Sequence, residues 1–317
     1  MTPDRKTILV TGGAGFIASH LSDAFVDAGH RVLIVDDLSG GKRENVPAAA
    51  ELFTHDIRDS ATADLIREAS VDVIVHHAAQ MDVRRSTEDP RFDADVNIGG
   101  TLNLLTAATE ASVDQVIFAS TGGAIYGEQD YYPAREDHPQ RPVSPYGVSK
   151  LAAERYLFYF HVAHGLNATC LRYANVYGER QNPHGEAGVV AIFLKKLLAG
   201  ENCRINGDGL QTRDYIHVSD VVAANVAALG KPGFNTYNVG TGIETNVVEL
   251  YHGLTAALGL DSAPEHGPAA AGEQRRSCID ATAGREALGL DAPLDLAAGF
   301  ARTAEWFRGR ANEASTA

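Results

Sequence analysis

Thr11-Gly12-Gly13-Ala14-Gly15-Phe16-Ile17-Ala18 follows directly on a short apolar run at residues 6–10. Gly12 allows a tight turn from a strand into a helix, and Gly15 lets the backbone approach a pyrophosphate closely. A helix that starts here offers free N–H groups and the positive end of its dipole to that anion. Ala18 replaces the usual third glycine and is small enough to keep the helix packed against the strand. The segment therefore predicts a strand, loop and helix that bind a dinucleotide.

The next strands end in residues that suit the same ligand. The strand predicted at residues 31–35 ends at Asp36, whose carboxylate can accept hydrogen bonds from ribose hydroxyls and would repel a 2′-phosphate. Asp37 adds a second negative charge, so NAD is favoured over NADP. Asp56 follows the third strand, where it suits either the adenine amino group or the cap of a turn or helix. Ala78-Ala79-Gln80 follows the fourth strand, and its small residues let the backbone pass close to the cofactor.

Strand-like and helix-like segments alternate over the first 160 residues, which is typical of a doubly wound parallel sheet. We expect an α/β fold, with a Rossmann-type NAD domain over residues 1–172, to which later segments return. A smaller substrate-binding domain is expected over residues 173–317. The predicted strands are residues 6–10, 31–35, 52–54, 71–76, 115–119, 168–172, 203–205 and 236–239. The predicted helices are residues 16–28, 61–69, 91–111, 145–164, 187–199, 219–229, 247–258 and 294–308.

The composition points to a globular protein of the cytoplasm. Of the 317 residues 44% are hydrophobic and 21% are charged, and the net charge of −14 disfavours nucleic acid or an anionic membrane as a partner. No run approaches the roughly 20 apolar residues that cross a bilayer. The widely spaced cysteines, Cys170, Cys203 and Cys278, suit a reducing compartment. The adjacent His76 and His77 point to opposite sides, so no metal site is expected.

A second group of residues predicts catalysis. Tyr146 and Lys150 lie four residues apart near the start of a predicted helix, so both project from one face. A tyrosine has a reference pKa of about 10, and a nearby ammonium and the positive nicotinamide ring both favour the phenolate. Ser120 and Thr121 stand at the end of a predicted strand, where ligands bind in open α/β sheets. Either hydroxyl can hydrogen-bond the substrate oxygen that Tyr146 deprotonates.

Nine motifs spread over most of the chain resemble the extended short-chain dehydrogenase/reductases, and within them the UDP-glucose 4-epimerase branch. They are T-G-G-A-G-F-I-A-S-H, V-D-D-L-S, H-D-I-R-D, H-A-A-Q, S-T-G-G-A-I-Y-G, S-P-Y-G-V-S-K, L-R-Y-A-N-V-Y-G, T-R-D-Y-I-H-V-S-D and N-V-G-T-G. The resemblance implies that Tyr146 is the base and acid, assisted by Ser120 or Thr121. It also implies that Lys150 lowers the pKa of Tyr146 and holds the nicotinamide ribose.

The resemblance further implies which residues touch the ligands. Asn97 resembles an asparagine that contacts the cofactor and steadies the site, whereas Met81 stands where some relatives have a cofactor-binding lysine. The residues assigned to NAD are Gly12, Gly15, Phe16, Ile17, Asp36, Asp37, Asp56, Ile57, Ala78, Ala79, Gln80, Asn97, Tyr146 and Lys150.

The substrate is expected to be a UDP-sugar. Asn175 and Arg213 resemble contacts of the diphosphate, and a guanidinium suits paired phosphate oxygens. Ser277 falls near the position that limits bulk at the sugar 2-substituent, so an N-acetyl group is admissible beside a hydroxyl. A second arginine is usual where Ala270 precedes Gly272-Glu273, and Arg275 or Arg276 is the candidate substitute.

These residues predict a 4-epimerase that oxidises and re-reduces carbon 4 of a UDP-hexose through a 4-keto sugar. A 4,6-dehydratase is disfavoured because Gly122-Gly123-Ala124 carries no titratable group. Arg84-Arg85 can meet a substrate carboxylate, which leaves a UDP-glucuronate 4-epimerase or decarboxylase open. A non-catalytic NAD-sensing regulator is the remaining alternative. Relatives commonly form homodimers through the helices expected at residues 91–111 and 145–164, so a homodimer is expected.

Overall fold

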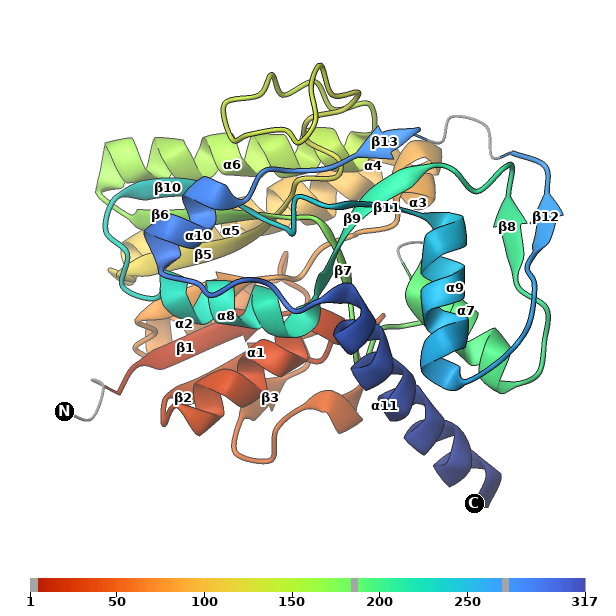
Figure 1. Cartoon of the computed structure of the whole chain (residues 1–317). Helices are drawn as coiled ribbons and strands as arrows, with labels where there is room; N and C mark the ends of the chain where they lie inside the picture. Colours follow the sequence, from red (N-terminus) through yellow and green to blue (C-terminus); the bar gives the residue numbers. More distant parts are fainter. Residues whose placement is uncertain (1–4, 184–187, 270–273, 317) are drawn as a thin grey trace.

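A seven-stranded sheet forms the centre of the larger unit of the computed structural model, which describes residues 5–183, 188–269 and 274–316 (Figure 1). All of its neighbouring strands are parallel, in the order β10-β6-β5-β4-β1-β2-β3. This order confirms the predicted doubly wound sheet. The strands are β1 (Thr7–Thr11), β2 (Arg31–Val35), β3 (Glu51–Phe53), β4 (Val73–His76), β5 (Gln115–Thr121), β6 (Asn167–Tyr173) and β10 (Phe234–Val239).

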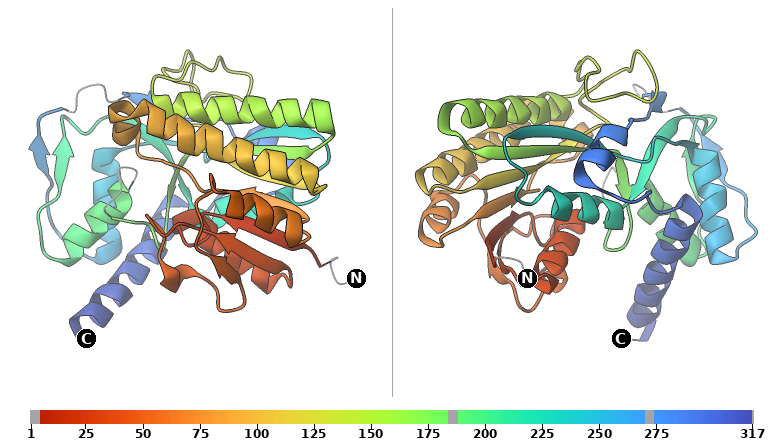
Figure 2. Two further views of the ribbon diagram at one scale, coloured as in Figure 1. Left: turned by 180° about the vertical axis from the view of Figure 1, so that it is seen from behind. Right: turned by 60° about the vertical axis from the view of Figure 1, so that its left-hand side comes forward.

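Helices cover both faces of this sheet, so its strands bury apolar side chains on both sides (Figure 2). Ile8 and Val10 of β1 point into one layer and Leu9 into the other. Each fully buried side chain of this size contributes about 1.5–3 kcal/mol relative to exposure. One face carries α1 (Phe16–Asp27), α8 (Val218–Ala228) and α10 (Thr282–Leu288), and the other α2 (Ser60–Glu68), α5 (Gly100–Glu110) and α6 (Pro145–His164).

The helix α6 has the predicted bounds and well-defined ends. The Ser144 side chain accepts a hydrogen bond from the Gly147 N–H, Pro145 occupies the first turn, and Gly165 ends the helix in the left-handed conformation. Its inner face includes Leu157 and Phe160, which are buried in the core together with Leu105 of α5, while Leu102 is partly buried. These side chains therefore pack inward, against the sheet.

The single helix predicted at residues 91–111 is wrong in detail. The chain forms α4 (Pro90–Ala94), a π-helical turn η2 (Asp95–Gly99) and then α5. The Asn97 side chain is bonded to Gln80 on a different segment, and Gly100 packs so closely that an added Cβ would lie 2.5 Å from Ile57 Cδ1. The Asn97 hydrogen bonds and the close packing of Gly100 thus occur within and next to the π-helical turn. A short helix that was not predicted, α3 (Val83–Glu88), precedes α4.

The smaller unit packs beside the carboxyl ends of the parallel strands (Figure 1). Its core includes Tyr177, Leu194, Tyr251 and Phe300. One sheet contains β7 (Asn175–Tyr177), β9 (Thr212–His217), β11 (Glu244–Asn246) and β13 (Arg276–Ser277). A second sheet pairs β8 (Arg204–Asn206) with β12 (Glu265–Gly267), and the helices are α7 (Val189–Leu198), α9 (Val247–Leu258) and α11 (Leu296–Thr316). Within the described ranges, no helix has the length and apolar character required to cross a membrane.

Candidate active site

The loop between β1 and α1 is shaped to receive an anion. Gly12 has φ +71°, and a Cβ there would lie 2.8 Å from the Ala78 backbone nitrogen. Gly15 is the N-cap of α1 and supplies no side-chain acceptor to the first-turn N–H groups at Phe16 and Ile17. These groups and the helix dipole can therefore serve a pyrophosphate.

Asp36 ties this loop to the end of β2. Its Oδ2 accepts the Ala14 N–H at 3.0 Å and its Oδ1 accepts the Leu38 N–H at 2.8 Å. Burial raises the pKa of Asp36, and these two hydrogen bonds act in the opposite direction. A carboxylate has about four acceptor positions, so Asp36 can also accept ribose hydroxyls. Asp37 is exposed and accepts hydrogen bonds from the Ser39 N–H and hydroxyl.

Asp56 lies at the same edge of the sheet but is already paired. Arg58 donates to it from Nε at 3.0 Å and from Nη2 at 2.6 Å, and this interaction lowers the pKa of Asp56. Arg58 also donates to Asp95, at 2.5 Å. The side chain of Ile57 is buried and packs against Gly100. Asp56 thus keeps its charge in an ion pair beside the predicted adenine position.

The two adjacent histidines at the end of β4 are neutral and have separate hydrogen-bonding partners. His76 is hydrogen-bonded to the hydroxyls of Thr11 and Thr101, at 2.8 and 3.0 Å. His77 Nε2 lies 3.0 Å from the Tyr173 hydroxyl. Burial lowers the pKa of His77 to about 3 and that of His76 well below its ordinary value. Both imidazoles are therefore neutral, and each has its own partners.

Asn97 clamps the backbone that follows the histidines. Its Oδ1 accepts the Gln80 N–H at 2.9 Å, and its Nδ2 donates to the Gln80 carbonyl at 2.8 Å and to Asp93 Oδ1 at 3.0 Å. The side-chain amide is thus engaged by protein groups. It fixes the position of Ala78-Ala79-Gln80 relative to α4, which steadies the segment that passes beside Gly12.

The two candidate hydroxyls at the end of β5 differ in environment. Ser120 is buried and donates a 2.6 Å hydrogen bond to Glu154 Oε1 of α6. Thr121 is partly exposed, and its Oγ1 accepts the Ala124 N–H at 3.2 Å, so its own hydroxyl can still donate. The structure therefore leaves Thr121 as the hydroxyl that faces the edge of the sheet.

Tyr146 and Lys150 share the first turns of α6. Lys150 Nζ donates to the Ala119 carbonyl at 2.9 Å and lies 5.9 Å from the centroid of the Tyr146 ring. Burial lowers the pKa of Lys150 to about 8, opposed by the charges of Asp93 and Glu154. Burial raises the pKa of Tyr146, and Asp93 adds to this rise. In the protein alone, the pKa of Tyr146 is thus raised, whereas the pairing with Lys150 had led us to expect a lowered pKa.

Close packing brings the start of α6 to the end of β5. A Cβ on Gly147 would lie 2.8 Å from the Ala124 carbonyl oxygen, so the first turn of α6 rests on the loop after Thr121. On the same loop, a Cβ on Gly123 would lie 3.7 Å from Asn175 Oδ1 and 3.9 Å from Thr121 Oγ1. Thr121, Asn175 and the start of α6 therefore converge at the carboxyl edge of the sheet.

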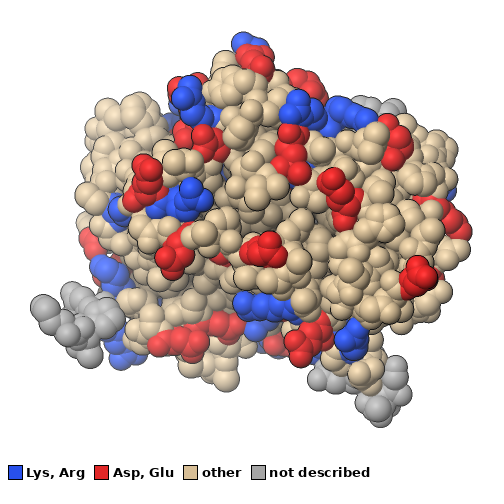
Figure 3. Space-filling model, in the orientation of Figure 1, with Lys and Arg blue, Asp and Glu red and all other residues tan. Residues whose placement is uncertain are grey.

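Arg213 and Ser277 are brought together by the smaller sheet. They are register partners in the parallel pair of β9 and β13. The Arg213 Nη1 donates to the Thr212 carbonyl at 2.8 Å, and Ser277 is buried. Figure 3 shows basic and acidic side chains intermingled over one face of the molecule. This face therefore presents no field of one sign.

The two candidates for a second diphosphate arginine both hold carboxylates. Arg275 donates from Nη1 and Nη2 to Asp208 at 2.8 and 2.9 Å. Arg276 donates from Nε and Nη2 to Glu244 at 2.9 and 2.6 Å. Either would have to exchange its carboxylate for phosphate oxygens in order to serve the substrate.

Arg84 lies on α3 and is exposed. Its backbone N–H donates to the helix cap Asp82 at 2.8 Å. The position where a second diphosphate arginine is usual, Ala270 before Gly272-Glu273, lies outside the described residues.

Four buried residues of the site had not been singled out from the sequence. Asp93 accepts a 2.6 Å hydrogen bond from the Ser149 hydroxyl, and Arg172 forms a buried salt bridge with Glu154 at 2.7 Å. Helical spacing contained a signal for two of them. Glu154 lies one turn beyond Lys150, and Asp93 one turn before Asn97. A pairing such as Arg172 with Glu154 joins a strand to a helix and has no signature in spacing.

The site fits a dinucleotide. The glycine cradle at Gly12, the α1 N-terminus without a side-chain cap and the Asp36 carboxylate form a line along the carboxyl edge of the sheet. Next along this edge come the Ala78-Ala79-Gln80 backbone and the Tyr146–Lys150 pair. This order matches pyrophosphate and adenosine at one end and a reactive ring at the other.

Comparison with known proteins agrees with this geometry. Residues 8–240 match the model of the NAD-dependent epimerase/dehydratase family. A UDP-glucose 4-epimerase of Mycolicibacterium smegmatis is 46% identical over 95% of this chain and 98% of its own. A structure of the Thermotoga maritima UDP-glucose 4-epimerase with UDP-glucose is 43% identical, with a TM-score of 0.94 over 96% of this chain and 99% of its own. A UDP-N-acetylglucosamine 4-epimerase from Methanobrevibacter ruminantium, in complex with UDP-N-acetylmuramic acid, is 31% identical, with a TM-score of 0.92 over 97% and 99% of the two chains. The chain belongs to the NAD-dependent epimerase/dehydratase family.

Proposed function

We propose that this protein is a UDP-hexose 4-epimerase that interconverts UDP-glucose and UDP-galactose with bound NAD. The observation that carries the proposal is the Tyr146–Lys150 pair beside Thr121, in a chain 46% identical to a UDP-glucose 4-epimerase over nearly its whole length. A regulator that had lost catalysis would not need this tyrosine and lysine. The non-catalytic alternative is therefore disfavoured.

The larger unit holds the cofactor in this proposal, and the smaller unit holds the sugar nucleotide. The strand β10 and the helices α8 and α10, although late in the sequence, pack on the larger sheet and belong with it. Asp36 is the ribose acceptor, and Asp37 adds negative charge that disfavours a 2′-phosphate. The remaining groups that would hold NAD are Gly12, Gly15, Phe16, Ile17, Asp56, Ile57, Ala78, Ala79, Gln80 and Lys150, with Asn97 acting through the Gln80 backbone.

The proton chemistry falls to Tyr146. Its oxygen takes the proton of the sugar 4-hydroxyl. It returns this proton after the 4-keto sugar has rotated in the pocket to present its other face. Thr121 donates a hydrogen bond to the same sugar oxygen, and Lys150 holds the ribose hydroxyls. When bound, NAD supplies a hydride acceptor at carbon 4 and a cationic ring that favours the phenolate. Because the proton and the hydride both return, the net reaction changes only the configuration of carbon 4.

The diphosphate is assigned to Arg213 and Asn175, and the sugar 2-substituent to the neighbourhood of Ser277. The serine is small, and a UDP-N-acetylglucosamine 4-epimerase shares the fold at 31% identity. These two observations support UDP-N-acetylglucosamine as a second substrate. UDP-glucuronate stays an alternative because of Arg84, which lies exposed on α3.

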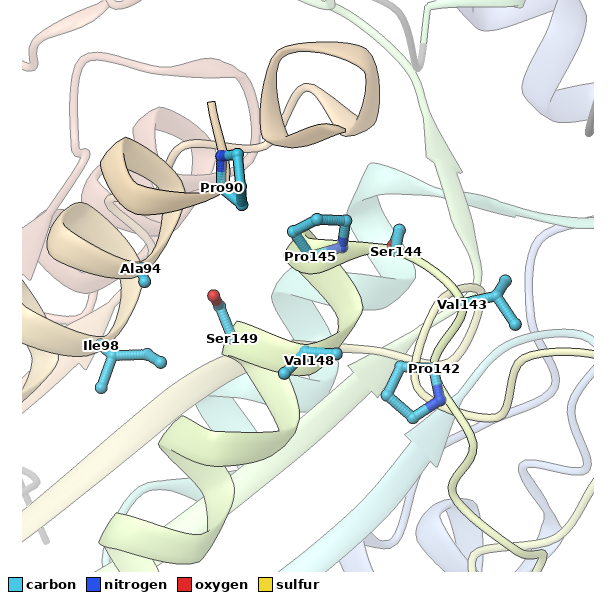
Figure 4. A pocket seen from close by; sticks show the side chains of 9 residues that line it. All are labelled: Pro90, Ala94, Ile98, Pro142, Val143, Ser144, Pro145, Val148 and Ser149. Carbon is cyan, nitrogen blue, oxygen red and sulfur yellow. The ribbon is translucent and has the colours of Figure 1, made fainter. Parts of the chain in front are cut away.

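We also propose that the protein forms a homodimer in the cytoplasm. The outer face of α6 exposes apolar side chains, with Val148 51% and Tyr159 56% accessible. Figure 4 shows an apolar groove next to this face, between α4–η2 and the start of α6. Its lining residues are Pro90, Ala94, Ile98, Pro142, Val143, Ser144, Pro145, Val148 and Ser149. Three free, buried cysteines are compatible with a reducing compartment.

A substrate panel tests the proposal. The purified protein is incubated separately with UDP-glucose, UDP-N-acetylglucosamine and UDP-glucuronate, with and without added NAD, and products are read by proton NMR. A stable mixture of 4-epimers from UDP-glucose supports the proposed reaction, and activity without added NAD indicates a retained cofactor. Unchanged sugars in all samples contradict it. Loss of carbon dioxide from UDP-glucuronate would instead indicate a decarboxylase.

A further inference from the structure

Asp93 is a carboxylate buried completely beneath the start of α6. Its Oδ2 accepts the Ser149 hydroxyl at 2.6 Å, and its Oδ1 accepts the side-chain amides of Gln80 and Asn97, both at 3.0 Å. All three donors are neutral groups. Burial of a carboxylate is costly unless it is hydrogen-bonded or meets a positive charge. Asp93 therefore has three hydrogen-bond donors but no cation among them.

The partners of Asp93 join the catalytic helix to the cofactor side of the sheet. Ser149 lies between Tyr146 and Lys150 in sequence, and its side chain is directed from α6 toward α4 (Figure 4). Gln80 and Asn97 belong to the clamp that holds the backbone after β4. One carboxylate thus fixes both elements between which the nicotinamide end of the cofactor is expected.

The charge of Asp93 acts directly on the catalytic pair. It raises the pKa of Lys150, opposing the effect of burial, and it raises the pKa of Tyr146. A negative charge here stabilises the ammonium and opposes the phenolate.

Other titratable groups near Lys150 offer no equivalent charge. Glu154, from α6, also acts on Lys150 but is held by Arg172 of β6 in a salt bridge of 2.7 Å. His76 and His77, at the end of β4, are neutral because burial lowers their pKa values. Among the described residues, Asp93 is thus the carboxylate near Lys150 whose hydrogen-bonding partners are all neutral.

We propose that Asp93 is a positioning residue of the 4-epimerase: it fixes the first turns of α6 through Ser149 and supplies the negative charge that stabilises the Lys150 ammonium. This inference rests on the proposed function for its kinetic consequence. The electrostatic coupling between Asp93 and Lys150 is a property of the fold and can be measured without catalysis.

The variant Asp93→Asn removes the charge and keeps the shape. In one orientation the asparagine oxygen accepts from Gln80 and Asn97, while its amide donates to the Ser149 oxygen, so all hydrogen bonds can be retained. Without the charge, Lys150 and Tyr146 both lose protons more readily. Both limbs of the pH profile of kcat/KM should therefore move to lower pH, by on the order of one unit. The matched control, Ser149→Ala, removes one hydrogen bond and keeps the charge. The pH profile of its kcat/KM should therefore not shift, even if the value of kcat/KM falls.

A double-mutant cycle provides the second measurement. Thermal unfolding at pH 7 is compared for the wild type, Asp93→Asn, Lys150→Met and the double variant. The change in Tm caused by Asp93→Asn should be more unfavourable with Lys150 present than with methionine in its place. Additive Tm changes would overturn the inference. So would a pH profile of Asp93→Asn that coincides with that of the wild type, or a pH profile of Ser149→Ala that shifts as far as that of Asp93→Asn. If the wild type is inactive but the Tm changes of the cycle are not additive, the proposed function is rejected and the electrostatic coupling between Asp93 and Lys150 stands.

Discussion

Ser120 Oγ donates a 2.6 Å hydrogen bond to Glu154 Oε1, and the same oxygen accepts the Nε of Arg172 at 2.9 Å. The Arg172 and Glu154 side chains are only 3% and 2% exposed. The Ser120 hydroxyl is therefore part of a buried ionic network that holds β5, β6 and α6 together. Thr121, one residue later, is left at the edge of the sheet. Two adjacent hydroxyls that look alike in the sequence thus have different surroundings.

Substitution of the two hydroxyls should separate these roles. Thr121→Ala should lower kcat about 10- to 100-fold with little change in the free energy of unfolding, because it removes a hydrogen bond to the reacting oxygen. Ser120→Ala should instead destabilise the protein by about 1–3 kcal/mol, because a buried carboxylate loses a donor. Steady-state kinetics and urea unfolding of both variants provide the comparison. A larger loss of kcat in Ser120→Ala than in Thr121→Ala would reverse the assignment.

Removal of the buried charge at position 154 should be costly. Glu154→Gln leaves the Arg172 guanidinium buried without its counter-ion, and we expect a loss of about 3–5 kcal/mol in the free energy of unfolding. Glu110→Gln is the matched control, because the Glu110 partner, Arg67, is exposed and its ion pair should contribute less than about 1 kcal/mol. Equal losses in denaturant unfolding would show that the buried pair contributes no more than a surface one.

The sequence was most informative where one local requirement decides the structure. The glycine loop at Gly12 and the capped helix from Pro145 to His164 follow from backbone freedom and end signals, and both were predicted closely. The break at Asp95–Gly99 was missed, because it involves contacts of Asn97 and Gly100 with distant segments. Local patterns carry no information on such contacts.

In the candidate site, too, local spacing identified some residues, whereas others depend on contacts with distant segments. Tyr146 and Lys150 were singled out because helical spacing puts them on one face. Ser120 and Thr121 could not be told apart, because the difference lies in Glu154, which reaches β5 from another element. Asp93 was overlooked because, in the sequence, an aspartate in a charged helix resembles a solvent-exposed residue.

Lys150 should destabilise the folded protein at neutral pH. Burial lowers its pKa from 10.5 to about 8, so between these values the unfolded chain binds more protons than the folded one. The free energy of unfolding contributed by this group therefore rises with pH from about 8 to 10.5, and the full cost applies below pH 8. Relative to Lys150→Met, the wild type should gain on the order of a few kcal/mol across this window. Parallel stability curves for the two proteins would contradict the assigned burial of the charge.

Arg213 should contribute mainly to substrate binding. Arg213→Lys keeps the charge but loses the fork that matches two phosphate oxygens, so KM should rise about tenfold with kcat nearly unchanged. Arg275→Lys is the control, because both Nη atoms of Arg275 already hold Asp208. Initial-rate kinetics decide between them. A rise in KM for Arg275→Lys alone would transfer the diphosphate contact to Arg275.

The central claim is that Tyr146 transfers the proton in a 4-epimerisation of a UDP-hexose. The most direct measurement is proton NMR of UDP-glucose incubated with the wild type and with Tyr146→Phe, each loaded with NAD and checked for bound cofactor. The wild type should produce UDP-galactose until the two sugars reach a stable mixture, and Tyr146→Phe should be slower by about 10²- to 10⁴-fold while still binding NAD. Equal rates in the two proteins, or no conversion by the wild type, would contradict the account.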